Sequence, residues 1–370
     1  MADPSLCRRC KERAGSLTLR NLPTCPECYI EHVDSKMRRR LGILNKDKKN
    51  SRDLEPRRYL AGLSFGPSST VMAAILDTSA DYHASKKASS PFEPHVVHID
   101  TTESPDGQVS EQAAKKMDEF RAKFPHITFE CVHVSRAMGL SSINWTLLPV
   151  PQDESLSPQQ KLSGMFNALP SITSRADVLR ILIRHLLISV ALENNYSTLL
   201  LAHSTTALAA LTLAEVANGR GFSVPAQVND GPMTVCTYED GKETSRLDFP
   251  VHYPLREVLK NELLKYMDLV PALQDMKVDE KQGAVVSHKD VSIEEVMQRY
   301  FEGVEGPYAG IVTNVVRTTG KLEPISGSEF CGLCGLTLDE KGDSRWAGEL
   351  GDEDHHGEKL CYGCKRSVYG

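Results

Sequence analysis

Eight of the ten cysteines stand in four C-x-x-C pairs, two pairs near each end of the chain. The members are Cys7, Cys10, Cys25 and Cys28 at one end, and Cys331, Cys334, Cys361 and Cys364 at the other. Four thiolates from two such knuckles suit a tetrahedral zinc ion, and a closed four-cysteine site has no open position for metal chemistry. We therefore expect two structural zinc sites; redox pairs or iron–sulfur centres are the alternatives.

The stretch from Arg57 to Asp77 has the pattern of a phosphate-binding turn, with an apolar run, a turn of small residues and an apolar helix. In such a turn, backbone N–H groups face an anion at the positive end of the helix. The candidate cradle is Ser64, Gly66, Ser68 and Ser69. We expect Phe65 to crowd this loop, and Pro67 has no N–H to donate. The prediction is an impaired nucleotide loop, with a plain strand-to-helix turn as the alternative.

Residues 35–58 form the one strongly basic stretch of a chain whose formal net charge is −6. Lysines and arginines that displace counterions are the main source of nucleic-acid affinity. The candidates for contact with RNA phosphates are Arg38, Arg39, Arg40, Lys48 and Lys49. The alternative is a solvated linker between the N-terminal cysteines and the core.

Three further side chains could take part in catalysis, but none has a second catalytic group close to it in the sequence. His203 follows a predicted strand, where it would face the ligand crevice of an open α/β sheet, but no carboxylate accompanies it. Cys131 lies within another predicted strand, and Cys236 has no histidine or second cysteine near it. We expect structural roles for all three, because an isolated cysteine usually packs as a small apolar side chain.

The composition describes a chain that can bury a sizeable core. It has 370 residues, of which 40% are apolar and 25% charged, so we expect one large domain with attachments. No apolar run is long enough to span a bilayer, and the first residues lack the apolar core of a signal peptide. We expect an intracellular, soluble protein, and in that reducing setting its cysteines favour metal ligands or catalytic thiols over disulfides.

Apolar runs in the middle of the chain alternate between strand and helix patterns, as in a parallel sheet. Strands are expected at 58–63, 95–99, 127–134 and 198–202, and helices at 69–76, 110–124, 172–194 and 205–218. The remaining expectations are a long binding or partly disordered connection over 136–170, an extended run over 224–237, a helix over 253–267, a helix over 293–301 and a run over 313–321.

In this order, the cysteine pairs, the basic stretch, the Ser-x-Gly-x-x-Ser loop, the strand ending in histidine and a Pro-Leu-Arg helix start resemble the tRNA-thiolation branch of the PP-loop (N-type ATP pyrophosphatase) family. The resemblance covers nearly the whole chain. Catalytic members read Ser-Gly-Gly-x-Asp-Ser in the loop, whereas here Phe65 replaces a glycine and Ser68 the aspartate. The family's Gly-His-x-x-Asp-Asp corresponds to Ala202, His203, Ser204, Thr205, Thr206 and Ala207, without its acidic pair.

The cysteines that do chemistry in the family are missing too. The C-x-x-C pair that opens a long helix corresponds to Ser171 and Ser174, and no cysteine stands between Asp268 and Lys277. All eight ribbon cysteines remain. The resemblance therefore implies a non-catalytic subunit of a wobble-uridine thiolase, in which ATP binding is doubtful.

The resemblance implies an α/β PP-loop core over 57–320, between zinc ribbons over 1–34 and 321–370, with a basic linker or helix over 35–56. It implies a heterodimer with a catalytic subunit that receives sulfur from a thiocarboxylated ubiquitin-related modifier and thiolates the wobble uridine of tRNAs for Lys, Glu and Gln. The ribbons and the helix over 172–194 are the expected contact surface, with a buried core helix as the alternative.

Two other functions remain open at this point. One is an active ATP-dependent tRNA sulfurtransferase that uses Cys131 and Cys236, and the other is a zinc-ribbon binding module unrelated to thiolation.

Overall fold

A six-stranded sheet forms the centre of the computed structural model, which describes residues 6–44, 57–86, 92–277, 291–325, 327–338 and 359–370. Across the sheet the strands follow the order β5-β4-β3-β6-β8-β7. Their bounds are β3 (Arg57–Leu63), β4 (Phe92–Asp100), β5 (Thr128–His133), β6 (Thr198–Leu200), β7 (Gly231–Glu239) and β8 (Lys242–His252). All neighbours are parallel except the edge pair β7 and β8. The predicted parallel α/β core is confirmed.

Helices cover both faces of the sheet, because alternate strand residues point to two separate cores. Tyr59, Ala61 and Leu63 of β3 pack on one side, and Leu60 packs on the other. The first face is covered by α1 (Pro26–Ile43), α2 (Pro67–Ala84), α3 (Glu111–Lys123) and α8 (Lys260–Leu269). The second face is covered by α4 (Pro158–Ala168), α5 (Ile172–Glu193), α6 (Thr205–Ala217) and α9 (Ile293–Thr319). The resulting doubly wound core places the carboxyl ends of the parallel strands at one edge, where α/β proteins bind ligands.

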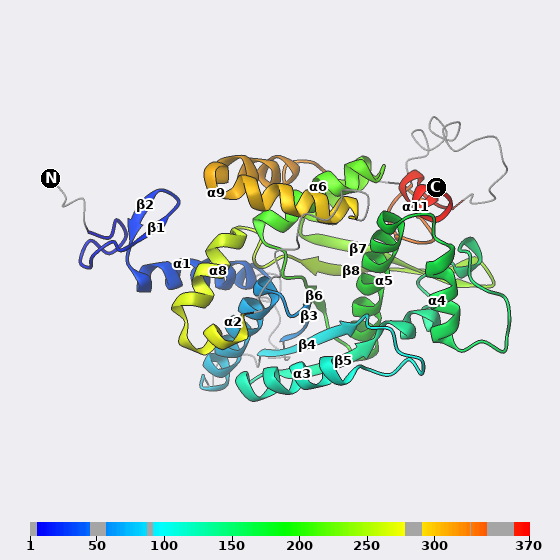
Figure 1. The fold of residues 1–370 in the computed structure, drawn as a ribbon, viewed down its shortest axis with the longest axis horizontal. Helices are drawn as coiled ribbons and strands as arrows, with labels where there is room; N and C mark the ends of the chain where they lie inside the picture. The colour runs from blue at the N-terminus through cyan, green and yellow to red at the C-terminus, as the bar shows by residue number, and fades with distance from the viewer. Residues whose placement is uncertain (1–5, 45–56, 87–91, 278–290, 326, 339–358) are drawn as a thin grey trace, which may run out of the picture.

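The N-terminal residues form an arm at one end of the long axis (Figure 1). Its hairpin joins β1 (Leu17–Leu19) to β2 (Leu22–Thr24) through Arg20 and Asn21, whose φ angles are 49° and 67°. Two positive φ angles are typical of a two-residue hairpin turn. Helix α1 then starts at Pro26, directly after Cys25. It continues without a break past residue 34, where the sequence predicted the ribbon to end and the basic linker to begin. At the opposite end of the molecule lies α11 (Tyr362–Tyr369), which carries the last cysteine (Figure 1).

Several predicted elements are corrected by the structure. The connection over 136–170 is an ordered layer with two 3-10 turns, Val134–Gly139 and Trp145–Leu147, followed by α4. Its apolar side chains, including Leu140, Ile143 and Met165, are buried on the core beside α5, which explains the order.

Three more boundaries differ from the sequence prediction. The run over 224–237 begins with a short helix, α7 (Val224–Val228), before β7. Helix α8 begins at Lys260, because the residues after Tyr253 form successive turns. The two C-terminal helical runs are one helix, α9, kinked at Tyr308 after Pro307, as proline removes a helix hydrogen bond.

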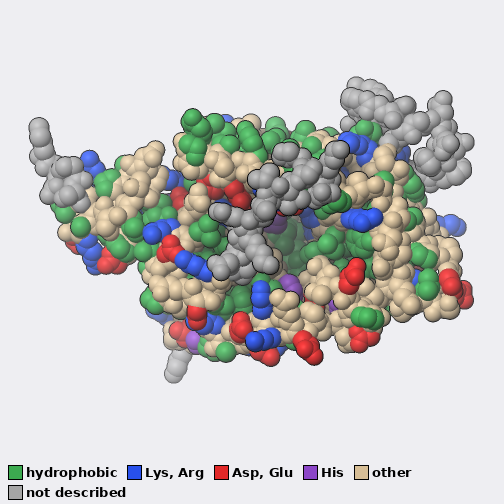
Figure 2. Space-filling model, viewed as in Figure 1, with side chains coloured by type: hydrophobic (Ala, Val, Ile, Leu, Met, Phe, Trp, Pro, Cys, Tyr) green, Lys and Arg blue, Asp and Glu red, His purple; other side chains and the backbone are tan. Residues whose placement is uncertain are grey.

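Helix α5 is a core helix, which agrees with the alternative given for it. Val178, Leu182 and Leu186 are fully buried, and Leu187 nearly so, which leaves these apolar side chains no free surface. By contrast, the outer surfaces of α6 and α9 are rich in hydrophobic side chains (Figure 2). The most exposed are Leu213 and Val216 on α6, and Tyr300, Tyr308 and Ile311 on α9. None of the described helices is long and apolar enough to cross a membrane.

Candidate functional site

The predicted loop lies between β3 and α2, at the carboxyl edge of the sheet. Its polar groups bond chiefly to one another: the Ser64 N–H donates to Ser69 Oγ at 3.2 Å, and that hydroxyl donates to the Gly66 carbonyl at 3.0 Å. Gly66 precedes Pro67, the first residue of α2, and provides no side-chain cap for it. The hydroxyls of Ser64 and Ser69 are therefore engaged within the turn.

Phe65 does not obstruct the loop, and this expectation is wrong. The residue has a φ of 59°, and its ring is buried in the core below the turn. It packs on His98, with ring centroids 4.1 Å apart, and on Phe120 at 5.4 Å. The bulky side chain therefore supports the loop from beneath instead of filling the space above it.

A pocket of about 470 Å³ brings most of the predicted loop residues together with His203. Its polar or small members are Ser64, Ser68, Ser69, His98, Thr101, Ala202, His203 and Ala207, and the rest of its described wall is Gly62, Leu63, Val97, Ile99, Ile183, Leu187 and Leu201. Among these described residues there is no carboxylate, no lysine, no arginine and no thiol. Gly66 is outside this set. The pocket thus has the position of a nucleotide site without the charged groups that hold magnesium and phosphates.

Both histidines of the pocket are held in the neutral form. Burial, together with the nearby charges of Arg180 and Arg184, lowers the pKa of His203 to about 4. Burial also lowers the pKa of His98, whose Nδ1–H donates to the Leu63 carbonyl at 2.8 Å. Near neutral pH both imidazoles are therefore uncharged while the pocket holds no anion.

The position that corresponds to the first aspartate of the family's acidic pair has become part of the scaffold. Thr206 is fully buried, and its hydroxyl donates to Glu305 of α9 at 2.6 Å. The other carboxylate oxygen of Glu305 accepts the N–H of Asn261 at 2.7 Å. The neighbouring Ala207 lines the pocket but offers no ligand atom.

The two serines at the start of α5 are not brought to this pocket. Ser171 and Ser174 bond to each other at 2.9 Å and line a different hollow with Arg366 and Ser367. Ile183, which does line the loop pocket, lies twelve residues further along α5, or about 18 Å at helical rise.

Cys131 and Cys236 lie on opposite edge strands of the sheet, β5 and β7. Five strand spacings separate them, which is about 24 Å. Burial raises the pKa of the Cys131 thiol to about 11, and burial also raises the pKa of Cys236. The two thiols cannot act at one centre, and neither is activated as a thiolate.

Both predicted four-cysteine groups are assembled. Within each group all four sulfur atoms lie within 4.8 Å of one another, and Cys10 and Cys25 are 3.9 Å apart. In the C-terminal group, Cys334 and Cys361 are 3.8 Å apart. Four thiolates at these separations can hold a metal ion, since tetrahedral bonds of about 2.3 Å place ligand sulfurs about 3.8 Å apart.

The C-terminal centre is part of the main core, unlike the N-terminal one. All four of its cysteines are buried, whereas Cys10 and Cys28 are partly exposed. A fully buried arginine, Arg220, points its Nη1 at Cys364 Sγ from 3.8 Å and is paired with Asp177 and Glu215. Gly363 fits this contact, because a Cβ there would lie 2.4 Å from Arg220 Cγ.

The predicted basic cluster is largely neutralised within the chain. Arg38 pairs with Asp34 at 2.8 Å, Arg39 pairs with Glu257, and Arg40 pairs with Asp230. Lys48 and Lys49 lie outside the described residues. Arg39 and Arg40 therefore fasten α1 to the core, whereas the Arg38 pair lies within α1.

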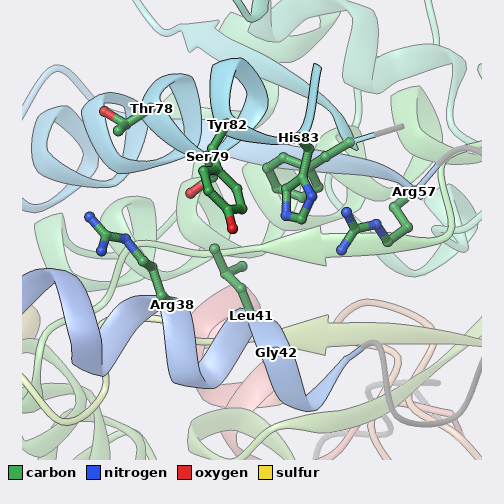
Figure 3. A pocket seen from close by; sticks show the side chains of 9 residues that line it. Arg38, Leu41, Gly42, Arg57, Thr78, Ser79, Tyr82 and His83 are labelled. Carbon is green, nitrogen blue, oxygen red and sulfur yellow. The ribbon is translucent and has the colours of Figure 1, made fainter. Parts of the chain in front are cut away.

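A second cavity, of about 550 Å³, lies at the opposite edge of the sheet, where α1 and α2 end. Arg38 and Arg57 stand at its two ends, with Tyr82 and His83 between them (Figure 3). The predicted loop residues and His203 do not line it. This cavity is distinct from the loop pocket.

Sequence reasoning missed the buried partners Glu305 and Arg220. Glu305 meets Thr206 across 99 positions of chain, and Arg220 meets Cys364 across 144. Local spacing carries no signal for pairs this distant, so only the fold reveals them.

The doubly wound sheet, the turn before α2 and the pocket above it define a PP-loop domain with a four-cysteine group at each end. The U34-tRNA thiolase NcsA from Methanococcus maripaludis, solved with its 4Fe-4S cluster, has a similar structure, with a TM-score of 0.54. The match covers 93% of this chain and 96% of NcsA at 16% identity, and so concerns the fold.

Sequence comparison gives the family. The sequence model described as cytoplasmic tRNA 2-thiolation protein 2 matches residues 292–353. The protein of that name from Phaeosphaeria nodorum is 36% identical, covering 99% of this chain and 95% of the relative, and the one from Pyrenophora tritici-repentis is 34% identical over 98% and 94%. The chain belongs to the cytoplasmic tRNA 2-thiolation protein 2 family.

Proposed function

We propose that the chain is a non-catalytic subunit in the 2-thiolation of the wobble uridine of cytoplasmic tRNAs for Lys, Glu and Gln. It pairs with the catalytic subunit, cytoplasmic tRNA 2-thiolation protein 1, which receives sulfur from the thiocarboxylated ubiquitin-related modifier. Both relatives are named as cytoplasmic proteins, which supports that compartment for the reaction.

The observation that carries this proposal is the wall of the loop pocket. Adenylation of a uridine requires groups that hold magnesium and stabilise the charge of the phosphates. The described wall offers hydroxyls, two neutral histidines and apolar side chains. The pocket therefore supports a subunit that provides surface, while ATP and sulfur chemistry take place on the partner.

Zinc is the metal we propose for both four-cysteine centres. A cubane cluster places four irons between its thiolates, so its ligand sulfurs must stand farther apart than those of a single ion. The separations of 3.9 Å and 3.8 Å match one tetrahedral zinc. At such a closed site, zinc would cross-link the four cysteines and stabilise the fold, with no open position for catalysis.

The outer faces of α6 and α9 are the surface that we propose for the catalytic subunit. On α9, Tyr308 is 61% exposed and Ile311 51% exposed, and on α6 Val216 is 54% exposed. Helix α9 also lies within the segment matched by the family model. An exposed apolar surface on a single chain indicates a protein–protein contact. Because α9 lies in the segment that the family model matches, we favour a permanent partner over a transient one.

Reconstitution tests the proposal. The catalytic subunit alone, this chain alone and their mixture are assayed for thiolation of a tRNA for Lys, together with pyrophosphate release. We expect activity only in the mixture, and unchanged activity when this chain carries Cys131→Ser and Cys236→Ser. Pyrophosphate release by this chain alone, or loss of thiolation in the folded double variant, would restore the sulfurtransferase alternative.

The partner surface has its own variant in the same assay. Tyr308→Asp with Ile311→Asp is expected to abolish co-purification and thiolation together. Leu247→Asp is a matched control, because Leu247 is 38% exposed on the edge pair of strands away from α9. If the wild type, the double variant and Leu247→Asp all form the complex equally well, α9 is not part of the interface.

A further inference from the structure

The arm over residues 6–44 has a surplus of positive charge, with nine Lys and Arg against four Asp and Glu in a chain of net charge −6. Six of the nine form ion pairs. These are Arg13 with Glu27, Arg20 with Glu262, Lys36 and Arg39 with Glu257, Arg38 with Asp34, and Arg40 with Asp230. Most of the arm's charge is therefore used to fold the arm and hold it to the core.

The three remaining cations lie together on the first metal knuckle. Arg8, Arg9 and Lys11 are exposed, and within the described part of the chain none of them pairs with a carboxylate. One contact fixes Arg9, whose Nη1 donates to the Cys28 carbonyl at 3.4 Å. These three residues are called the knuckle cations below.

The knuckle cations stand on a rigid turn. The Cys7 N–H donates to the Arg13 carbonyl at 2.7 Å, the Arg8 N–H to the Pro23 carbonyl at 2.9 Å, and the Lys11 N–H to the Cys7 carbonyl at 2.9 Å. With Cys7 and Cys10 held at the metal centre, the backbone that carries the three charges is fixed. Less conformational entropy is then lost when the side chains bind a ligand.

The position of the turn also favours the binding of an extended anion over that of a small one. The arm projects from the body at one end of the long axis (Figure 1), so the knuckle cations stand away from the acidic remainder of the chain. Adjacent cations on a protruding turn can meet successive phosphates of a nucleic-acid backbone, which carries about one charge per few ångströms.

We propose that the knuckle cations Arg8, Arg9 and Lys11 bind the phosphate backbone of RNA, in place of the α1 arginines that the sequence pattern indicated. The inference deepens the proposed function, because it rests on tRNA being the substrate of the complex. It assigns the contact to backbone phosphates, so binding is independent of RNA sequence.

A salt titration tests the assignment. The full chain, alone and with the catalytic subunit, is titrated with a fluorescent tRNA from 50 to 200 mM KCl. For Arg8→Ala, Arg9→Ala and Lys11→Ala combined, we expect the slope of log K against log salt to shrink by about 2 to 3, with affinity about tenfold weaker at low salt. Arg8→Lys with Arg9→Lys keeps the charges and is expected to retain the slope.

The matched control removes three exposed cations elsewhere, Lys115→Ala, Arg175→Ala and Lys321→Ala. It changes net charge equally, and salt screens charges beyond about 10 Å, so its slope should equal that of the wild type. Zinc content confirms that each variant keeps a folded arm.

An unchanged slope in the knuckle variant, or an equal loss in the control, overturns the inference. Equal displacement of tRNA by polyglutamate at matched charge would assign the surface to an acidic protein instead. If the wild-type chain supports thiolation but the knuckle variant binds tRNA as well as the wild type does, the RNA contact is wrong and the proposed function stands. If the wild-type mixture does not thiolate tRNA, the proposed function fails.

Discussion

At the scale of single residues, the hydrogen bond between Thr206 and Glu305 explains how a catalytic position can be absorbed into a scaffold. The Glu305 side chain is 2% exposed, and burial raises the pKa of its carboxyl group. The Thr206 hydroxyl donates one hydrogen bond to it, and the Asn261 N–H donates another. An acidic side chain at position 206 would meet this carboxylate at hydrogen-bond distance with no proton to donate.

We expect Thr206→Asp, which restores an acidic residue at the family's motif position, to destabilise the protein by about 3 kcal/mol, because two buried carboxylates would face each other. Urea unfolding measures the change. Ala207→Asp is the matched control, since Ala207 faces the pocket, and its cost should stay below about 1 kcal/mol. Equal stability of the two variants would show that Glu305 does not constrain position 206.

Residue patterns in the sequence predicted the sites that depend on local spacing. The C-x-x-C pairs predicted both four-cysteine groups, because a knuckle is built within four residues. The same patterns misjudged Phe65, since the φ of 59° that turns its ring into the core is a property of the folded turn. They also gave no sign of the ion pairs of Arg39 and Arg40, whose acidic partners stand about two hundred positions away.

At the scale of elements, the arm is joined to the core chiefly through α1 and α8. Arg20 in the hairpin turn pairs with Glu262 of α8 at 2.6 Å, and His32 of α1 lies 3.7 Å from the same carboxylate. Burial alone would raise the pKa of Glu262, but its contacts with His32 and Arg20 outweigh burial and lower it to about 2. The ionised carboxylate therefore favours the docked arm.

A carboxylate whose folded pKa is depressed stabilises the fold above its ordinary pKa of about 4.5, and the contribution is lost as pH falls toward 2. We expect Glu262→Gln to lower stability by about 2 kcal/mol at pH 7, with a difference from the wild type that shrinks below pH 4. Thermal unfolding from pH 7 to pH 3 measures this.

Glu31→Gln provides the control for the pH experiment, because Glu31 is exposed on α1 and forms no ion pair within the described residues. It should match the wild type at every pH. A Glu262→Gln difference that stays constant down to pH 3 would mean that the ionised carboxylate does not hold the arm.

Element types were easier to predict than element lengths. Alternating apolar runs identified the strands β3 to β6, and the long apolar pattern identified α5. The ordered layer over 136–170 escaped prediction, because Leu140, Ile143 and Leu148 are spaced irregularly and are buried only through contact with α5. Tertiary burial, which has no period in the sequence, decides such segments.

At the scale of the whole molecule, the two four-cysteine groups lie at opposite ends and in different surroundings (Figure 1). The N-terminal group lies in the arm, while the C-terminal cysteines belong to the largest hydrophobic cluster, together with side chains of α5 and α9. Loss of the first centre should be local, and loss of the second should weaken the entire domain.

We expect the wild-type chain to carry about two zinc ions, and Cys7→Ser and Cys364→Ser to carry about one each. Cys364→Ser should lower the main thermal transition strongly or prevent soluble expression, whereas Cys7→Ser should leave that transition in place. Cys131→Ser is the control and should keep both ions. Iron in place of zinc, or equal thermal shifts for the two ribbon variants, would contradict this arrangement.

If the chain is non-catalytic as proposed, the bond between Thr206 and Glu305 also bears on how easily evolution could restore an aspartate at position 206. A lineage that regained the aspartate first would pass through a poorly folded intermediate, whereas one that first changed Glu305 to glutamine would give up a stabilising contact for no gain in activity. Each route begins with a loss of fitness, although the double change Thr206→Asp with Glu305→Gln allows one amide to satisfy both partners. Through Glu305, helix α9 would thus oppose the return of an aspartate at position 206 unless both residues changed together.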